Sequence, residues 1–446
     1  MPLTRRRLLQ SSAGLALLSS CGAPTGTPDS GPDEPVPSPA RSPEPSPWSA
    51  PGTLDDVAFD RGMQVGDVGP SGAMISIRTA EPALTLVLMR EEADGWIEVS
   101  RTPVTGGDGG AQLALDGLEP DTAYTACFYA PDDTRRCAPS RFRTALEEGA
   151  ARIVTFGASS CFGGNRPWPT LSFAAAEQLD FFVLLGDTVY ADGAETVADY
   201  RVFWDEALST GGLRALCSST SLVATWDDHE VGNDWSPETD AVIAVAALQA
   251  FREALPIAGE PIWRALRWGD AVELFVLDCR GERRDGDYVS PEQMAWLQDA
   301  LAASPARFKI IVNSVPITHF AGTALSDYFD DQRWQGFPAQ REEILAFIRD
   351  QEIGGVVWLA GDFHFGLLAR VDPAGGAGED AWEVLAGPGG SFLNPIVELL
   401  DDTDRFPVAF GAFNYVRFSA DPGTGTLSVA WIGDDGAIID EAVLEV

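Results

Sequence analysis

From about residue 150 onward, short apolar runs of strand length alternate with stretches of helical character. The runs lie at 152–157, 181–186, 221–226, 271–278, 308–315 and 355–361. Helical patterns lie between them, in PWPTLSFAAAEQL, AVIAVAALQAFREAL, SPEQMAWLQDALAA and FPAQREEILAFIRD. Ser290 followed by Pro291 marks a helix start, because it joins an N-cap serine to a proline in the first turn. The alternation predicts βαβ units and a sheet with helices on both faces, and residues 414–446 return to strands.

Residues 53–147 show strand patterning without helices, in MISIRT, LTLVLMRE and AQLAL, separated by turns. The segment from Leu118 to Tyr124 resembles the tyrosine corner of a fibronectin type III sandwich. We therefore expect a small N-terminal β-sandwich domain at 53–147, followed by a catalytic domain at 148–446. Cys127 and Cys137 flank the turn-like APDD, and in an exported protein this predicts a hairpin disulfide between them.

The first residues are predicted to form an export signal and not a part of the fold. In residues 1–21, three arginines precede a short apolar stretch, as in a twin-arginine export signal. Leu18-Ser-Ser-Cys21 resembles a lipobox, which predicts lipidation of Cys21; alternatively, the signal is simply cleaved and Cys21 is incidental. Residues 22–52 are rich in Pro, Ser, Gly and Thr and read as an extended tether.

Composition adds that the chain is globular and strongly acidic. Its hydrophobic content is 45%, its formal net charge is −37, and Lys309 is its one lysine. Such a surface repels phosphate backbones and anionic lipids, which argues against nucleic acid as a partner. The acidity fits a need for solubility or an acidic or saline habitat; a cation-binding surface is the alternative.

Chemistry-bearing residues stand at the ends of the apolar runs. The three histidines of the chain, His229, His319 and His364, each follow one. Two further runs end with such residues, one at Cys161 and the other at Asp187, Tyr190 and Asp192. Strand ends that carry such residues are how an α/β enzyme builds a metal site from remote segments, so this pattern predicts one.

Each of these segments has a simpler interpretation beside the functional one. In GDTVYAD, Gly186 allows a sharp turn, Asp187 can bridge two cations and Tyr190 can supply a phenolate to ferric iron; a plain structural turn is the alternative. In WDDHE, Asp227, Asp228 and His229 are costly to bury without partners, unless the segment is an acidic surface turn.

The remaining candidates are less determined. Asn233 offers an amide oxygen to a metal or a substrate. Asp362 and His364 could reach different metals of one site. Cys161 is a candidate thiolate ligand, or a free buried cysteine, or a disulfide partner of Cys217 or Cys279.

For two further residues, the sequence allows either a role in the site or a structural role. His319 faces the site or is a satisfied loop histidine. Arg280 is a clamp for an anionic oxygen group, or forms a salt bridge with Asp278 or another acid.

Together, SSC, GDTVYAD, WDDHE, LDxR, NSVP and GDFH resemble the alkaline phosphatase D family, also called PhoD-like phosphatases, in that order along the chain. The resemblance covers 55–446 and extends to purple acid phosphatases and other calcineurin-like metallophosphoesterases. It implies an α/β fold class: a sandwich of mixed sheets flanked by helices, preceded by a fibronectin III-like β-sandwich. Where those relatives have GNHE and GHxH, this chain has DDHE and GDFH, so Asp228 and Asp362 replace an asparagine and a histidine.

The resemblance also implies cofactors and roles. Ferric iron (Fe3+) would be held by Cys161, Asp187, Tyr190 and His364, and calcium (Ca2+) by Asp187, Asp228 and Asp362. His229 would protonate the leaving oxygen or stabilise the transition state, and Arg280 would hold phosphoryl oxygens during in-line attack. Asp227, Asn233 and His319 are further possible substrate or metal contacts. GPGGSF at 387–392 shapes the pocket rim or is a plain turn.

We therefore expect an exported, membrane-anchored lipoprotein, monomeric, that hydrolyses phosphoesters, with diesters favoured over monoesters. One rival is a catalytically inactive surface-binding lipoprotein on the same fold. Another is a hydrolase of a different ester, such as a phosphotriester or a sulfate ester. The stretch GERRDGDY after Arg280 departs from the family pattern, so the substrate pocket is expected to differ.

Overall fold

The structure is a computed structural model that describes residues 48–445, apart from Asn165 and residues 321–331. The predicted signal at 1–21, the lipidation site Cys21 and most of the predicted tether lie outside the described residues. Among the helices of the described part, none is both long enough and apolar enough to cross a membrane.

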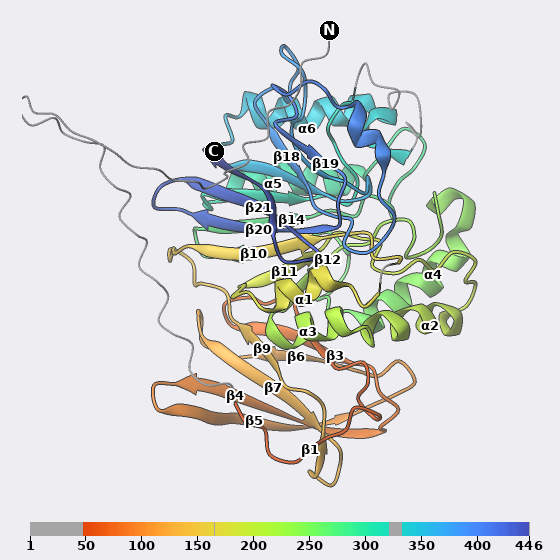
Figure 1. The fold of residues 1–446 in the computed structure, drawn as a ribbon, viewed down its shortest axis with the longest axis vertical. Helices are drawn as coiled ribbons and strands as arrows, with labels where there is room; N and C mark the ends of the chain where they lie inside the picture. The colour runs from red at the N-terminus through yellow and green to blue at the C-terminus, as the bar shows by residue number, and fades with distance from the viewer. Residues whose placement is uncertain (1–47, 165, 321–331, 446) are drawn as a thin grey trace, which may run out of the picture. The chain divides into compact units, whose positions relative to one another are not determined.

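Two large sheets form the centre of the molecule (Figure 1). In the first, nine strands run in the order β22-β21-β20-β10-β11-β12-β2-β3-β6. Its middle strands β10 (Val154–Ser159), β11 (Phe181–Leu184) and β12 (Ser221–Ala224) are parallel. On one side lie the antiparallel strands β20 (Asn414–Asp421), β21 (Thr426–Gly433) and β22 (Ile438–Glu445).

The second sheet has seven strands in the order β13-β14-β15-β16-β18-β17-β19. Its parallel strands are β14 (Val272–Val276), β15 (Phe308–Val312), β16 (Val356–Ala360) and β18 (Trp382–Leu385). Antiparallel strands complete it: β13 (Arg264–Trp268), β17 (Gly366–Arg370) and β19 (Val408–Phe410). The six strands predicted from apolar runs after residue 150 are all present.

Burial on both faces explains why these strands read as continuous apolar runs. Phe156 and Val183 of the first sheet share one buried core with Leu274 and Ile310 of the second, so the two sheets face each other. Successive side chains of a strand point to opposite faces, and Phe182 of β11 packs instead into a core built with helices.

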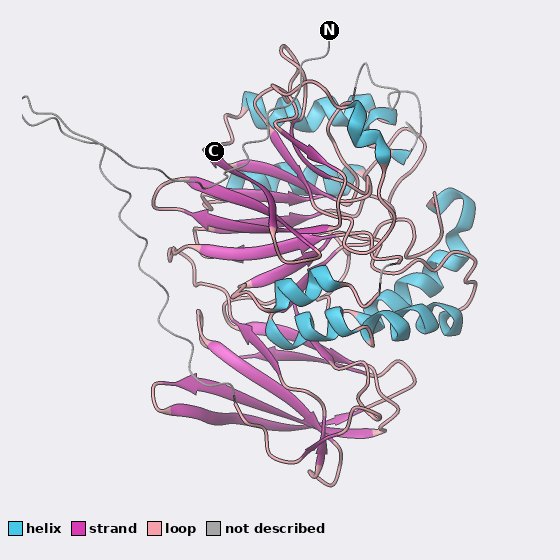
Figure 2. Ribbon diagram, in the orientation of Figure 1, coloured by secondary structure: helices cyan, strands magenta, loops and turns pink. Residues whose placement is uncertain are grey.

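Helices cover the outer faces of both sheets (Figure 2). The first sheet carries α1 (Pro169–Ala175), α2 (Val197–Leu208), α3 (Gly211–Ser219) and α4 (Pro237–Ala254). The second carries α5 (Pro291–Ala303) and α6 (Pro338–Asp350). The predicted start of α5 is confirmed, because the Ser290 side chain accepts a hydrogen bond from the backbone N–H of Gln293, and Pro291 is the first helical residue.

Residues 53–147 contain strands joined by turns and no helix, which agrees with their predicted strand patterning. A six-stranded sheet contains β1 (Thr53–Leu54), β4 (Ala83–Glu92), β5 (Gly95–Thr105), β7 (Ala123–Tyr129), β8 (Arg135–Arg136) and β9 (Ser140–Arg143). It packs against β2 (Met63–Gly66), β3 (Gly72–Ile77) and β6 (Ala111–Asp116) through a shared core. The Tyr124 hydroxyl accepts a hydrogen bond from the Glu119 backbone N–H, as in a tyrosine corner.

One strand pairing crosses the predicted boundary between residues 147 and 148. Gly66 of β2 pairs in parallel with Leu222 of β12, so three strands of the N-terminal region extend the first large sheet. The N-terminal region is therefore joined to the catalytic part through backbone hydrogen bonds as well as by the chain itself.

The disulfide predicted between Cys127 and Cys137 is not formed in the structure. Both thiols are buried, and their sulfur atoms lie 4.0 Å apart as free cysteines. The Cys137 sulfur instead accepts a hydrogen bond from the Phe128 backbone N–H. The spacing in the sequence correctly placed the two side chains together, but packing between neighbouring strands accounts for their contact without a covalent bond.

Candidate active site

The predicted site residues follow the carboxyl ends of parallel strands in both sheets. Cys161 comes after β10, Asp187 after β11 and His229 after β12. Arg280 follows β14, and His364 follows β16. Because the carboxyl ends of parallel strands lie at the same edge of a sheet, segments far apart in the sequence meet here.

The backbone at these strand ends is strained. Cys161, Asp187, Asp362 and His364 have φ of 60°, 55°, 61° and 59°, in the left-handed region that non-glycine residues seldom adopt. Gly186, with φ of 99°, makes the predicted sharp turn, and a Cβ there would lie 2.6 Å from the Cβ of Asp227. Such strain persists where the surrounding structure holds it in place, as it does at functional sites.

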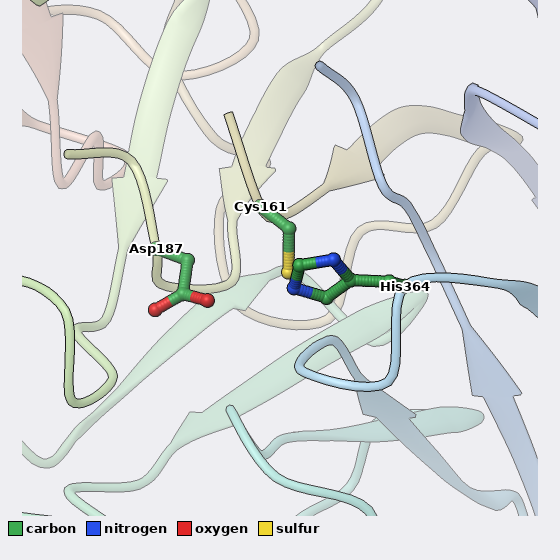
Figure 3. A group of neighbouring side chains, drawn as sticks. All are labelled: Cys161, Asp187 and His364. Atoms are coloured by element: carbon green, nitrogen blue, oxygen red, sulfur yellow. The ribbon is translucent and has the colours of Figure 1, made fainter. Parts of the chain in front are cut away.

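A first group of candidate ligands consists of Cys161, Asp187 and His364 (Figure 3). All three are buried, and one ligand atom from each lies within 4.8 Å of the others. The Tyr190 hydroxyl adjoins this group, at 3.2 Å from Asp187 Oδ2 and 3.3 Å from His364 Nε2. The four residues predicted to hold iron are therefore neighbours in space.

His364 is oriented by a backbone carbonyl. Its Nδ1 lies 2.9 Å from the carbonyl oxygen of Phe392, and since a carbonyl can only accept, Nδ1 donates the proton. Burial lowers the pKa of His364 to about 4, so the imidazole is neutral at neutral pH. A neutral ring with Nδ1 committed presents Nε2 as a metal ligand.

A second group shares Asp187 and adds Asp228 and His229, again with ligand atoms within 4.8 Å of one another. This differs from the predicted calcium set, which had Asp362 in place of His229. Asp362 lines the same cavity as Asp187 and Asp228. The Asp228 carboxylate accepts a hydrogen bond of 2.6 Å from the Asp234 backbone N–H, which fixes its direction.

His229 is held by a residue to which the sequence assigned no role. Its Nδ1 lies 3.0 Å from both carboxylate oxygens of Asp192. Its ring stacks on that of Tyr190, with centroids 4.0 Å apart and an interplanar angle of 27°. Asp192 belongs to the same GDTVYAD turn as Asp187, which is the signal that could have identified it.

Glu230 is a second residue whose role the sequence did not indicate. Its buried carboxylate accepts hydrogen bonds from the backbone N–H groups of Asp187, Thr188 and Asp227, at 2.6–2.9 Å. It therefore ties the turn after β11 to the turn after β12. Burial raises the pKa of Glu230, although the three N–H groups act in the opposite direction.

Arg280 is an ion-pair partner as well as a wall of the cavity. Its Nε lies 2.5 Å from Asp227 Oδ1, and its terminal nitrogens reach Gln332 Oε1 at 3.0 Å and Asp228 Oδ2 at 3.8 Å. Of the predicted alternatives, a salt bridge is thus present, but with Asp227 and not with Asp278. Its role as a clamp on substrate oxygens stays a prediction.

The carboxylates of the site carry charge that the protein alone does not balance. Burial, followed by repulsion from neighbouring carboxylates, raises the pKa of Asp187 well above its usual range. Burial likewise raises the pKa of Asp227 to about 7 and that of Asp362 to about 8. Burial also opposes ionisation of Asp228, but Arg280 and His229 outweigh it, and its pKa is lowered.

These features fit metal ions. Among the described residues, Asp187 Oδ1 and Asp227 Oδ2 are buried oxygens without a hydrogen-bond partner. The buried carboxylates, the thiol, the phenol and the neutral imidazole are suitable ligand atoms for cations. Burying carboxylates without a positive charge is unfavourable, and a bound cation would offset that cost. The donor set of the first group is mixed, whereas Asp187, Asp228 and Asp362 offer oxygen alone.

A cavity of about 450 Å³ opens beside these groups. It is lined by Asp187, Asp228, His229, Asn233, Asp234, Arg280, Gln332, Arg333, Asp362, Phe363, His364, Phe392, Asn394 and Ile396. Asn233 thus lines the cavity, and its contact with a metal or a substrate stays a prediction, whereas Asp227 is not among the lining residues that the structure describes and contacts Arg280. His319 is not among the lining residues that the structure describes, and its backbone N–H donates to the Val371 carbonyl, which favours the loop interpretation.

The glycine-rich segment 387–392 does more than form a plain turn. The backbone N–H groups of Gly390 and Ser391 donate to the Cys161 carbonyl, at 3.1 and 2.9 Å. The next residue, Phe392, holds His364 and lines the cavity. The segment therefore fixes two residues of the first group and forms part of the rim.

Comparison with solved structures gives the class of fold. The chain aligns with purple acid phosphatase PPD1 from yellow lupin (Lupinus luteus) seeds at a TM-score of 0.63 and 14% identity, over 86% of this chain and 73% of that one. It aligns with the structure of PhoD at a TM-score of 0.76 and 21% identity, over 90% of each chain. The predicted calcineurin-like metallophosphoesterase fold is confirmed.

The sequence comparison gives the family. The PhoD-like phosphatase family matches residues 156–406, so the chain belongs to this family and the resemblance seen in its motifs is confirmed. Alkaline phosphatase D of Bacillus subtilis (strain 168) is 28% identical over 309 residues, which cover 56% of this chain and 52% of that protein. The chain thus spans about half the length of this curated relative.

Proposed function

We propose that this chain is a metal-dependent phosphoester hydrolase whose ions bind where the two sheets bring their strand ends together. The observation that carries the proposal is the pair of ligand groups that share Asp187, each with its ligand atoms within 4.8 Å. Membership of the PhoD-like phosphatase family supports the reaction class. An intact ligand set argues against the rival of an inactive binding protein.

The proposed ions are ferric iron and calcium. Iron would be held by Cys161, Asp187, Tyr190 and His364, and calcium by Asp187, Asp228 and Asp362, since calcium prefers oxygen donors. When bound, such ions would act as Lewis acids that stabilise the negative charge developing on the phosphoryl oxygens during in-line displacement.

The protein side chains would position the substrate and move a proton. Asp192 occupies Nδ1 of His229, which leaves Nε2 free to give a proton to the leaving oxygen. Arg280 lines the cavity, so its guanidinium can contact a phosphoryl oxygen while Asp227 holds its Nε. The short Arg280–Asp227 contact keeps the guanidinium in place before a substrate arrives.

Hydrolysis of bis(p-nitrophenyl) phosphate by the purified protein tests the proposal. We expect turnover with calcium, loss of turnover with a chelator, and no turnover in Asp187→Ala. A metal-loaded protein that does not cleave this diester, p-nitrophenyl phosphate, or a phosphotriester would overturn the hydrolase reading. A higher kcat/KM for the diester than for the monoester would support the proposed preference for diesters.

We further propose that the protein is exported by the twin-arginine route, anchored through a lipid on Cys21, and monomeric. A Pro- and Ser-rich tether would then hold the catalytic part away from the membrane. Cell fractionation tests the anchor: we expect the wild-type protein in the membrane fraction and Cys21→Ser in the soluble fraction. An Arg5→Lys, Arg6→Lys variant that is exported normally would argue against the twin-arginine route.

A further inference from the structure

The cavity beside the ligand groups is lined by two kinds of side chain. Asp228, His229, Asn233 and Asp234 are polar or acidic. Three apolar lining residues, which we call the aromatic wall, are Phe363, Phe392 and Ile396. A phosphate placed at the carboxylates and Arg280 would therefore share the cavity with apolar as well as polar side chains.

Phe392 is the most exposed member of this wall. Its side chain is 66% exposed, although aromatic side chains are usually buried. Its ring nevertheless has a defined place, 4.1 Å from the His364 ring between centroids at an angle of 43°. The backbone is fixed too, because the Phe392 carbonyl accepts from His364 and Ser391 N–H donates to Cys161. An exposed ring on a fixed backbone is pre-organised for contact with a ligand.

Phe363 extends the wall next to the ligands Asp362 and His364. The Arg333 guanidinium lies 5.3 Å from the centroid of its ring, and the rings of Phe320 and Phe365 support it at 5.1 and 5.8 Å. Arg333 and Arg280 both line the cavity. The two guanidinium groups and the aromatic wall thus lie around one space, which suits a ligand that combines a phosphate with an apolar ring.

We propose that the aromatic wall binds a planar aromatic group attached to the phosphorus, an aryl or nucleobase-bearing ester group, in preference to a polyol. This inference rests on the function proposed above, because it assumes that the phosphate binds at the carboxylates and Arg280. Phe392, Phe363 and Ile396 offer the hydroxyl groups of a polyol no side-chain hydrogen bond, whereas a ring buries apolar surface against them.

Binding of non-hydrolysable phosphonates to the metal-loaded protein tests this without turnover. Isothermal titration calorimetry would compare phenylphosphonate, n-butylphosphonate, methylphosphonate and 2,3-dihydroxypropylphosphonate. We expect phenylphosphonate to bind about tenfold more tightly than the methyl and dihydroxypropyl compounds, as one aromatic contact predicts. Equal affinity for phenyl and methyl compounds would overturn the proposal, and equal affinity for phenyl and butyl compounds would overturn its aromatic character.

Three variants locate the effect. In Phe392→Ala the ratio of phenyl to methyl affinity should fall to about one, and in Phe392→Leu it should fall partway. Leu393→Ala is the matched control, because Leu393 is the next residue, is 40% exposed and does not line the cavity. An unchanged ratio in Phe392→Ala would place the preference elsewhere and overturn the assignment. His364 keeps its partner in every variant, since that partner is a backbone carbonyl.

The same preparations separate this inference from the proposed function. A preference for phenylphosphonate without hydrolysis of bis(p-nitrophenyl) phosphate, p-nitrophenyl phosphate or a phosphotriester supports the aromatic wall and contradicts the hydrolase. Hydrolysis without the preference contradicts the aromatic wall alone. A thymidine phosphonate that binds more tightly than phenylphosphonate would identify a nucleobase-bearing ester as the source, and the reverse order would identify an aryl ester.

Discussion

The two ligand groups share Asp187 but balance their charge in different ways. In the first, burial raises the pKa of Cys161 and of Tyr190 and lowers that of His364, so the protein alone holds all three side chains neutral. In the second, Asp228 has a lowered pKa, whereas the pKa of Asp187 is raised, as are those of the neighbouring Asp227 and Asp362, to about 7 and about 8. The first group thus holds neutral side chains, with the Tyr190 hydroxyl within hydrogen-bond distance of Asp187 and His364, whereas the second lies among carboxylates that repel one another.

This difference indicates how the two groups should respond to the loss of an ion. Without an ion, side chains of the first group can hydrogen-bond to each other, since the Tyr190 hydroxyl is within hydrogen-bond distance of both Asp187 and His364. The second must take up protons or another cation, because its buried carboxylates otherwise face each other. We therefore expect an ion that is firmly held in the first group and exchangeable in the second.

Removal of the shared residue should have the largest effect. We expect Asp187→Ala to lose both ions and to lower kcat by about 1,000-fold or more, because both groups lose a ligand. His364→Ala should lose iron only and Asp362→Ala calcium only. Metal analysis beside turnover would check this, and an Asp187→Ala protein with full metal content would contradict the shared role.

Asp180→Asn is the matched control for that comparison. Asp180 is also a buried aspartate, but it pairs with Arg152 and accepts from the Thr155 N–H, away from the site. The substitution should lower stability by about 1–3 kcal/mol, the usual cost of breaking a buried polar pair, while metal content stays unchanged.

Selective removal of calcium should separate the groups. A calcium chelator should abolish turnover, and added calcium should restore it, while iron content stays constant. Any visible charge-transfer band of the ferric protein should survive the chelator and disappear in Tyr190→Phe, since it requires the phenolate. A band that remains in Tyr190→Phe would rule out Tyr190 as the iron ligand.

Loss of Asp192 should lower activity without removing either ion. In Asp192→Asn, His229 loses the carboxylate that holds its Nδ1, and we expect kcat to fall by about 10- to 100-fold. Glu195→Gln is the control, because Glu195 is an exposed acid on the same loop. Full activity in Asp192→Asn would show that His229 needs no positioning partner.

The smallest expected effect is the change in the stability of the metal-free protein with pH. Asp227 and Asp362 have pKa values in the folded protein above that of an ordinary aspartate, so the metal-free native state retains protons that the unfolded state has released. The metal-free protein should therefore lose stability as pH rises from about 4 to about 8, by a few degrees in Tm. Calcium should raise the Tm more at pH 8 than at pH 5. Thermal unfolding with and without calcium measures this, and equal calcium effects at both pH values would contradict it.

Much of the fold could be predicted because its signals are local. The six runs after residue 150 are strands buried on both faces, and an apolar run of strand length is visible in any one segment. Among the described strands after residue 150, those that escaped prediction are β13, β17, β18 and β19. These are short, or they mix arginine and glutamate with apolar residues, as in Arg264–Trp268. Their pairing with a neighbouring strand decided their conformation.

The sequence by itself determined which residues reach the site, because a residue just after a parallel strand must lie at the carboxyl edge of its sheet. Cys161, Asp187, His229, Asp362 and His364 all follow this rule. Only the tertiary structure decided which of them contact each other. Asp192 meets His229, Asp227 meets Arg280, and the Phe392 carbonyl meets His364 because the loops after different strands approach one another in the folded chain. The spacing of residues along the chain does not encode those contacts.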